Sequence, residues 1–202
     1  AKGAVLGGHG LTTWAQTSTE CEKRSIDAIE KAEKFLAAKG KKDPLGTLVK
    51  EWAPLSPDAR KAKAALLAPA LRGIASMDAP MLGSFSDAEV VLDFISHSEL
   101  TRLAALGTSC PDHFLRTKIS PMVLDTPADA SVEDVIARAH ELHEKYRETY
   151  ATYYKKYAKP ESPAMRGADP LIILVPGVGM FSYGKDKQTS RVAGEFYINA
   201  IN

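Results

Sequence analysis

A run of five consecutive aliphatic residues, Leu171–Val175, constrains the fold more than any other feature of the sequence. A run without alternating polar residues is typical of a strand that is buried on both faces. Both faces of such a strand need cover from other elements, so the chain needs a layered structure. The glycine-rich residues from Pro176 to Gly184 predict a turn, and Asp186 is placed to cap a final helix.

Two long segments show the periodicity of amphipathic helices. Residues 131–158 keep apolar and tyrosine side chains on one helical face, and Ser131 suits the N-terminus of that helix. Thr17 and Glu20 have the spacing of a capping box, which predicts a helix that Gly40 ends.

Shorter elements lie between these segments. A helix is predicted from Asp58, with its apolar positions at helical spacing, and another from residue 100 to residue 106. Residues 4–15 predict a strand followed by a turn, and residues 89–95 and 122–124 predict further strands. Strands and helices in alternation favour the α/β class: a mixed sheet flanked by helices, with one long helix in the C-terminal half.

Two parts of the sequence resemble each other. Residues 9–15 align with residues 178–184, and a cap residue follows in each case, Thr17 or Asp186. A buried strand is predicted before both segments and a helix after both. The two ends of the chain are therefore predicted to hold equivalent strand–turn–helix units, of which only the first contains a histidine, His9.

Composition excludes several classes of protein. The 202 residues are 45% hydrophobic and 25% charged, with a net charge of +1, so no nucleic acid or anionic membrane is expected as a partner. Cys21 and Cys110 form no CxxC pattern, which argues against a disulfide framework and fits the cytoplasm. No apolar run has the roughly 18 residues that a transmembrane helix needs.

Histidines supply the candidate metal ligands. His9 stands between Gly8 and Gly10 at the end of a strand, where an imidazole can bind Zn²⁺, but a zinc site needs about three protein ligands. His140 and His143 lie one helical turn apart and can chelate a metal, although no glutamate like that of HExxH lies between them. The alternative for this pair is a largely exposed His140 and a His143 at the edge of the buried stripe.

Residues 108–118 are dense in side chains that can carry chemistry. Cys110 and His113 resemble a thiol–imidazole pair, with Asp112 beside them, and these three are the candidate catalytic residues within the chain. Arg116 and Lys118, together with Lys185, can form a patch that holds a phosphate or docks another domain. A structured connector is the alternative for this segment.

No nucleotide site is expected in the chain. Ser182 stands where a GxGxxG fingerprint beginning at Gly177 would need its last glycine, and no acidic residue closes a second strand about 20 residues later. The chain itself is therefore expected to bind no cofactor.

Three segments resemble a known enzyme family. Residues 4–14 with Thr17 and Glu20 resemble the late strand–turn–helix of class II, metal-dependent sugar-phosphate aldolases. Residues 97–100 with 106–118, and residues 174–186, resemble one subgroup, the bifunctional rhamnulose-1-phosphate aldolase/short-chain dehydrogenase family. The resemblance covers nearly the whole chain, and the second and third segments are its most specific parts.

The resemblance implies a chemistry for a longer parent enzyme. The parent would use zinc held by three histidines to cleave the sugar phosphate into dihydroxyacetone phosphate and lactaldehyde, and NAD to oxidise the aldehyde. His9 matches the third zinc ligand, whereas the HxH pair that supplies the other two does not occur in this chain. Tyr150 and Lys156 do not have the spacing of the Tyr-x-x-x-Lys pair of the dehydrogenase, and Tyr153 has no lysine at that spacing. A homo-oligomer acting on a small sugar phosphate is implied.

Three domains follow from these observations. Residues 1–42 are expected to end a class II aldolase-like domain, residues 43–80 to form a helical connector, and residues 81–202 to form an α/β subdomain that leads toward a dehydrogenase domain. Both ends look cut from a longer polypeptide, so a segment without activity of its own is expected. The alternatives are a non-catalytic structural or interaction domain, and an independent enzyme that uses Cys110 and His113.

Overall fold

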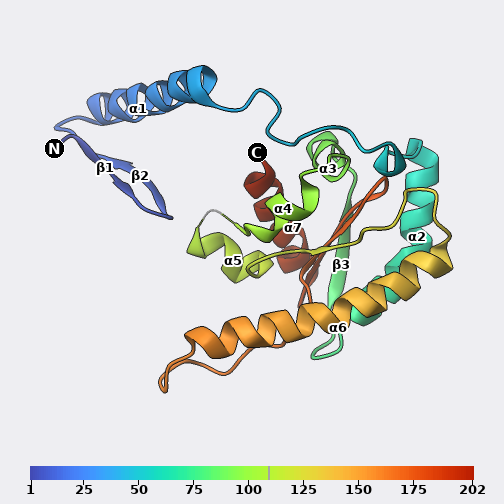
Figure 1. Ribbon diagram of the computed structural model, residues 1–202. Coiled ribbons are helices and arrows are strands. Elements are labelled where there is room, and N and C mark those ends of the chain that lie inside the picture. Colours follow the sequence, from blue (N-terminus) through green and yellow to red (C-terminus); the bar gives the residue numbers. More distant parts are fainter. Residues whose placement is uncertain (109) are drawn as a thin grey trace. The chain divides into compact units, whose positions relative to one another are not determined.

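The computed structural model describes residues 1–108 and 110–202, which form two compact units (Figure 1). The first unit comprises residues 1–44 and 109–112, and the second comprises residues 45–108 and 113–202. Within the described residues, no helix combines the length and the apolar character that crossing a membrane would require.

The first unit consists of a β-hairpin and a long helix. Strands β1 (Gly3–Leu6) and β2 (Gly10–Thr13) pair in antiparallel fashion, and α1 (Ser18–Lys39) follows them. The Thr17 side chain accepts a hydrogen bond from the backbone N–H of Glu20, which confirms the predicted start of this helix. The Glu20 carboxylate pairs with Arg24, so the hydrogen bond seen is the N-cap half of the capping box. The predicted turn after the first strand was only partly right, because Gly10–Thr13 returns as a second strand.

The second unit is built on a four-stranded mixed sheet. Its order is β3 (Leu82–Ser86), β6 (Gly179–Gly184), β5 (Ile172–Val175) and β4 (Met122–Val123). The β3–β6 and β6–β5 pairs are antiparallel and the β5–β4 pair is parallel. All of β5 is buried, so the predicted strand with two covered faces and the predicted mixed α/β class are both confirmed.

Helices cover both faces of this sheet (Figure 1). Helices α2 (Pro57–Ile74) and α6 (Val132–Tyr157) pack against Ile173 and Phe181 on one face. Helices α3 (Glu89–Ile95), α4 (Leu100–Ala105) and α7 (Lys187–Ile201) pack against Leu174 and Met180 on the other. Two short elements complete the fold, the 3₁₀ helix η1 (Lys50–Trp52) and helix α5 (Pro111–Thr117).

Two elements differ from the sequence-based prediction. Residues 89–95, predicted as a strand, form α3, because Val91, Phe94 and Ile95 at helical spacing are all buried on one side of the helix. Residues 179–184, predicted as part of a turn, form β6, the fully buried strand between β3 and β5. Only residues 176–178 make the turn; Gly177 within it has a φ of 74°, and Gly179, the first residue of β6, has a φ of 150°.

Glycine at position 177 is expected to be required for this turn. A Cβ on Gly177 would lie 2.1 Å from the Cβ of Ala128, and φ is +74°. Gly177→Ala should therefore destabilise the second unit by at least about 2 kcal/mol. At Gly73 in helix α2, an added Cβ would have no atom within 4 Å. Gly73→Ala should therefore stabilise the unit by about 0.5 kcal/mol, because alanine favours the helix more than glycine does. Urea unfolding of both variants checks this prediction, which two changes of the same sign would contradict.

Candidate functional site

His9 lies at the tip of the β1–β2 hairpin. Its backbone N–H donates to the carbonyl oxygen of Leu6 at 3.0 Å, and the flanking Gly8 and Gly10 adopt positive φ. The exposed imidazole carries Nε2 3.6 Å from a carboxylate oxygen of Asp112, which is also exposed and belongs to the same unit. An exposed pair of this kind contributes little to stability, so both groups remain available to a ligand.

The described residues do not by themselves make a metal site. His9 and Asp112 are two donors, and no group of three or more His, Cys, Asp or Glu side chains that could hold a metal exists within residues 1–108 and 110–202. A catalytic zinc site needs three protein ligands and an open position. The geometry thus provides part of a ligand set and no more.

We therefore expect the chain to bind Zn²⁺ with a dissociation constant no lower than about 1 µM, because two donors are too few for a stable site. Competition against a colorimetric zinc chelator measures this constant. His9→Ala should weaken this residual binding further, because it removes one of the two donors. Stoichiometric zinc that survives dialysis against the chelator would contradict the prediction.

The HxxH pair on α6 does not converge on one site. His140 is exposed, whereas His143 is buried and its Nε2 lies 2.9 Å from Oδ1 of Asp169. Since that ring nitrogen is already engaged by a carboxylate, the structure gives His143 a partner other than a metal. His143 is thus more deeply buried than the predicted stripe-edge position.

Several ionisable side chains gather around Asp169. We call this group the Asp169 cluster; its members are Asp78, Lys118, His143, Arg147 and Asp169. Arg147 donates to both carboxylates and holds Asp78 through two bonds of 2.9 Å. The hydrogen bond from Arg147 is also the main reason why the pKa of Asp78 lies below its usual value. Asp169 further accepts from the backbone N–H of Asp78 at 2.8 Å, so the cluster joins α6 to two loops.

Lys118 brings a buried ammonium group into this cluster. Its Nζ donates to the carbonyl oxygen of Gly167 at 2.9 Å and lies 4.1 Å from the ring centroid of Tyr150. Its backbone has a φ of 61°, a left-handed conformation that is rare outside glycine. Burial lowers the pKa of Lys118 to about 8, while the carboxylates of Asp169 and Asp78 act in the opposite direction. A strained, desolvated lysine is a frequent feature of functional sites.

The lowered pKa of Lys118 predicts a pH-dependent stability. Between about pH 8 and 10.5 the unfolded chain holds more protons at this lysine than the folded chain does, so its contribution to the free energy of unfolding rises with pH. Urea unfolding at pH 7.5 and 9.5 measures the free energy of unfolding of the wild type and of Lys118→Met. The wild-type value minus the variant value should be more positive at pH 9.5. Subtracting the two values cancels the contributions of the other titrating groups, which both proteins share. A value of this difference that does not change with pH would contradict the prediction.

Residues 108–118 hold two buried polar atoms without partners. Among the described residues, neither Oγ1 of Thr108 nor Nδ1 of His113 has a hydrogen-bond partner. The ring centroids of His113 and of Phe196 on α7 lie 5.0 Å apart in an edge-to-face arrangement. The hydroxyl of Thr117 donates to the backbone carbonyl oxygen of His113. Cys110 is a half-buried free cysteine. Within the described residues, Nδ1 of His113 therefore makes no hydrogen bond to the Cys110 thiol. Ser109, which belongs to the same segment, lies outside the described residues.

The predicted cationic patch is only partly available at the surface. Arg116 and Lys185 are exposed, whereas Lys118 directs its ammonium group to Gly167 and Tyr150. The patch remains a prediction for Arg116 and Lys185. The sequence analysis missed Asp78, Arg147 and Asp169. Two signals in the sequence were available. Arg147 follows His143 by one helical turn, and Asp169 stands two residues before the aliphatic run Leu171–Val175.

Comparison with known proteins places the chain in a family. Residues 62–202 match the family described as "Aldolase class II, second domain". The chain is also 31% identical over 195 residues to the "Uncharacterized oxidoreductase YuxG" of Bacillus subtilis (strain 168), an alignment that covers 96% of this chain. The chain spans 28% of the length of that relative. No solved structure is significantly similar.

The family match covers well over half of the chain and includes the whole sheet, the Asp169 cluster and both layers of helices in the second unit. It agrees with the mixed α/β architecture described above. The chain therefore belongs to the family of class II aldolase second domains.

Proposed function

We propose that the chain is part of a longer bifunctional enzyme of deoxysugar catabolism. Such an enzyme cleaves rhamnulose 1-phosphate into dihydroxyacetone phosphate and lactaldehyde, then oxidises the aldehyde with NAD. The observation that carries this proposal is the pairing of an aldolase second domain with a relative that is named an oxidoreductase and is more than three times as long. The two motif-rich segments, residues 97–118 and 174–186, support the same subgroup.

Within this enzyme the chain would supply one metal ligand and a supporting domain. His9 would bind zinc together with histidines from another part of the polypeptide, since its imidazole is exposed and pairs with Asp112 alone among the described side chains that form ion pairs. The dehydrogenase half would lie outside this chain. The isolated chain would consequently catalyse neither reaction.

The intact protein tests the proposal. With rhamnulose 1-phosphate and Zn²⁺, we expect release of dihydroxyacetone phosphate, and with lactaldehyde and NAD⁺ we expect formation of NADH. His9→Ala should lower aldol cleavage by roughly 100-fold or more and leave aldehyde oxidation unchanged. His140→Ala, an exposed histidine of α6, is the matched control and should affect neither activity. Cleavage that is insensitive to His9→Ala would refute the role of His9, and absence of both activities would refute the proposal.

A further inference from the structure

The β1–β2–α1 unit and the C-terminal part of the second unit, β5–β6–α7, have the same local structure. Each element of the second set starts 169 residues after its counterpart: Ile172 after Gly3, Gly179 after Gly10, and Lys187 after Ser18. The strand registers agree as well, because Gly3 pairs with Thr13 as Ile172 pairs with Ser182. The sequence similarity between the two ends is thus accompanied by an equivalent backbone.

The two hairpin turns are alike in detail. Gly8 and Gly10 have φ values of 68° and 155°, and Gly177 and Gly179 have values of 74° and 150°. In each turn the residue between the glycines donates its N–H at 3.0 Å to the carbonyl oxygen three residues earlier. Glycine adopts positive φ readily, so the evidence lies in the agreement of both φ values and of the hydrogen bond between the two turns, which adds to the short sequence match.

The helices that follow are also attached alike. The side chain of Thr17 accepts from the N–H three residues later, and so does that of Asp186. The hydroxyl of Thr13 lies 2.7 Å from that of Ser25, and Ser182 lies against Gly194 at the corresponding positions. The constant spacing therefore extends from the first strand well into the helix.

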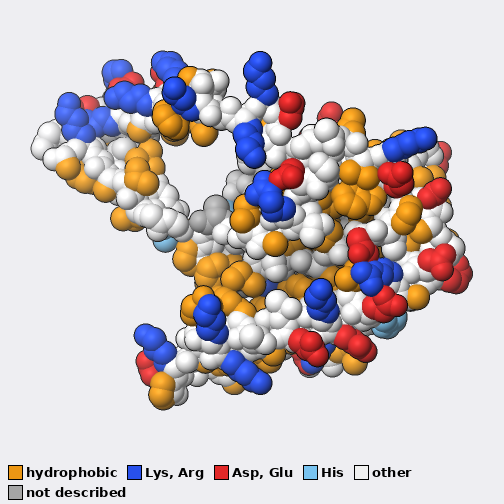
Figure 2. Space-filling view, in the orientation of Figure 1, with side chains coloured by type: hydrophobic (Ala, Val, Ile, Leu, Met, Phe, Trp, Pro, Cys, Tyr) orange, Lys and Arg blue, Asp and Glu red, His pale blue; other side chains and the backbone are white. Residues whose placement is uncertain are grey.

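Burial is where the two copies differ. Val5 is 80% exposed and Leu11 is 43% exposed, whereas their counterparts Leu174 and Met180 are 0% and 1% exposed. None of the residues of β1, β2 and α1 is buried. Figure 2 shows hydrophobic side chains at the surface of the hairpin and of α1. A hairpin alone is at best marginally stable in water, so this surface needs cover.

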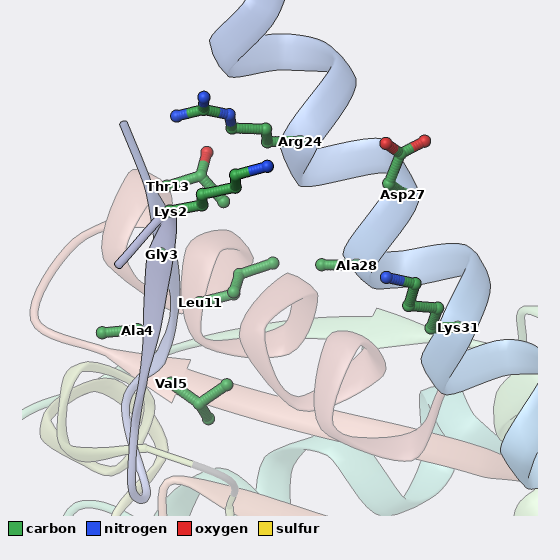
Figure 3. A pocket seen from close by; sticks show the side chains of 10 residues that line it. All are labelled: Lys2, Gly3, Ala4, Val5, Leu11, Thr13, Arg24, Asp27, Ala28 and Lys31. Carbon is green, nitrogen blue, oxygen red and sulfur yellow. The ribbon is translucent and has the colours of Figure 1, made fainter. Parts of the chain in front are cut away.

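The uncovered space has a defined place in the first unit. A cavity of about 410 Å³ opens between the hairpin and α1, and Val5, Leu11 and Ala28 lie around it (Figure 3). In the second copy, the apolar side chains of β5, β6 and α7 pack in one buried cluster with those of α3 and α4. The second copy thereby shows what an occupant of this cavity looks like.

From this repeat we propose that the first unit is the C-terminal end of a first domain that has the same architecture as residues 45–202. The rest of that domain, in the same polypeptide, covers the hairpin and α1. This inference rests on the longer enzyme of the proposed function. The family name "second domain" and the length of the relative support the presence of another domain in such a polypeptide.

The repeat specifies how the occupant binds. Strand β3 pairs antiparallel with β6, and β4 pairs parallel with β5. The first domain accordingly adds one antiparallel strand to β2 and one parallel strand to β1, and its helices fill the cavity beside Val5. Val178 occupies the position of His9, so the second domain lacks the imidazole and is a copy without this metal ligand.

Hydrogen exchange measured by mass spectrometry tests the inference on the 202-residue chain and on the intact protein. Amides of residues 3–13 should exchange rapidly in the chain and should be protected in the intact protein at the level of residues 172–182. Val5→Asp should reduce that protection by roughly 100-fold or more, because it buries an unpaired charge. In the chain alone Val5→Asp should change nothing. Gln16→Asp, whose counterpart Lys185 is exposed, is the matched control in both proteins.

Each other outcome overturns the inference. Protection of residues 3–13 in the dilute chain would show that the unit needs no cover. Protection that grows with chain concentration would show that a second copy covers it. Equal effects of the two variants in the intact protein would show that Val5 is not covered. Aldolase and dehydrogenase assays on the same intact protein are read separately, so a failed activity would refute the proposed function and leave the protection result standing.

Discussion

Asp169→Ala is expected to lower the free energy of unfolding of the second unit by about 3–5 kcal/mol. The side chain of Asp169 is 5% exposed and accepts hydrogen bonds from His143, Arg147 and the backbone of Asp78. Its removal leaves the buried imidazole of His143 without its carboxylate partner and takes away one of the two carboxylates that act on Lys118. Urea unfolding monitored by circular dichroism measures the loss.

A surface ion pair provides the matched control. Asp125 accepts two bonds of 2.8 Å from Arg138, but about half of its side chain is exposed. Asp125→Ala should therefore cost no more than about 1 kcal/mol. Asp169→Asn, which keeps the shape and one acceptor oxygen, should fall between the two. Equal losses for Asp169→Ala and Asp125→Ala would show that burial does not strengthen the Asp169 cluster.

The second large effect is expected in the core. Leu67 on α2 is 0% exposed and belongs to the cluster that α2 and α6 form on the sheet, so Leu67→Ala should cost about 2.5–5 kcal/mol. The adjacent Leu66 is 62% exposed, and Leu66→Ala should change the stability by less than about 0.5 kcal/mol. Both variants make the same chemical change in the same helix. Similar unfolding midpoints for the two would contradict the position of α2 on the sheet.

Elements with strong local signals were predictable from the sequence. The side chains of Thr17, Ser131 and Asp186 cap α1, α6 and α7 as expected, since a capping hydrogen bond depends on residues only three positions apart. The α2 stripe was also predictable, because the four apolar residues at helical spacing are the ones that are buried. Strand β6 was not, since its glycines resemble a turn and its strand state depends on pairing with β3 and β5.

In the candidate site, too, only the features with a local signal in the sequence were predictable. The position of His9 between two glycines marked its turn, and the structure places it there. The Asp169 cluster was not predicted, because its local signals are weak and its members lie on α6 and three separate loops that meet only in the folded unit. Lys118 gave a misleading signal: its neighbours in sequence suggested an exposed cation, whereas its partners come from residues 150 and 167.

The strand order of the second unit also governs what happens while the protein is made. Strand β3 leaves the ribosome before its partner β6, which follows about 100 residues later, since Leu82 pairs with Gly184. At about 5–20 residues per second, β3 waits roughly 5–20 s for that partner. During this interval its backbone N–H and C=O groups have no pairing strand, and a chaperone or another nascent chain can bind them. Ribosomes that stall before residue 179 would release a chain that cannot assemble this sheet.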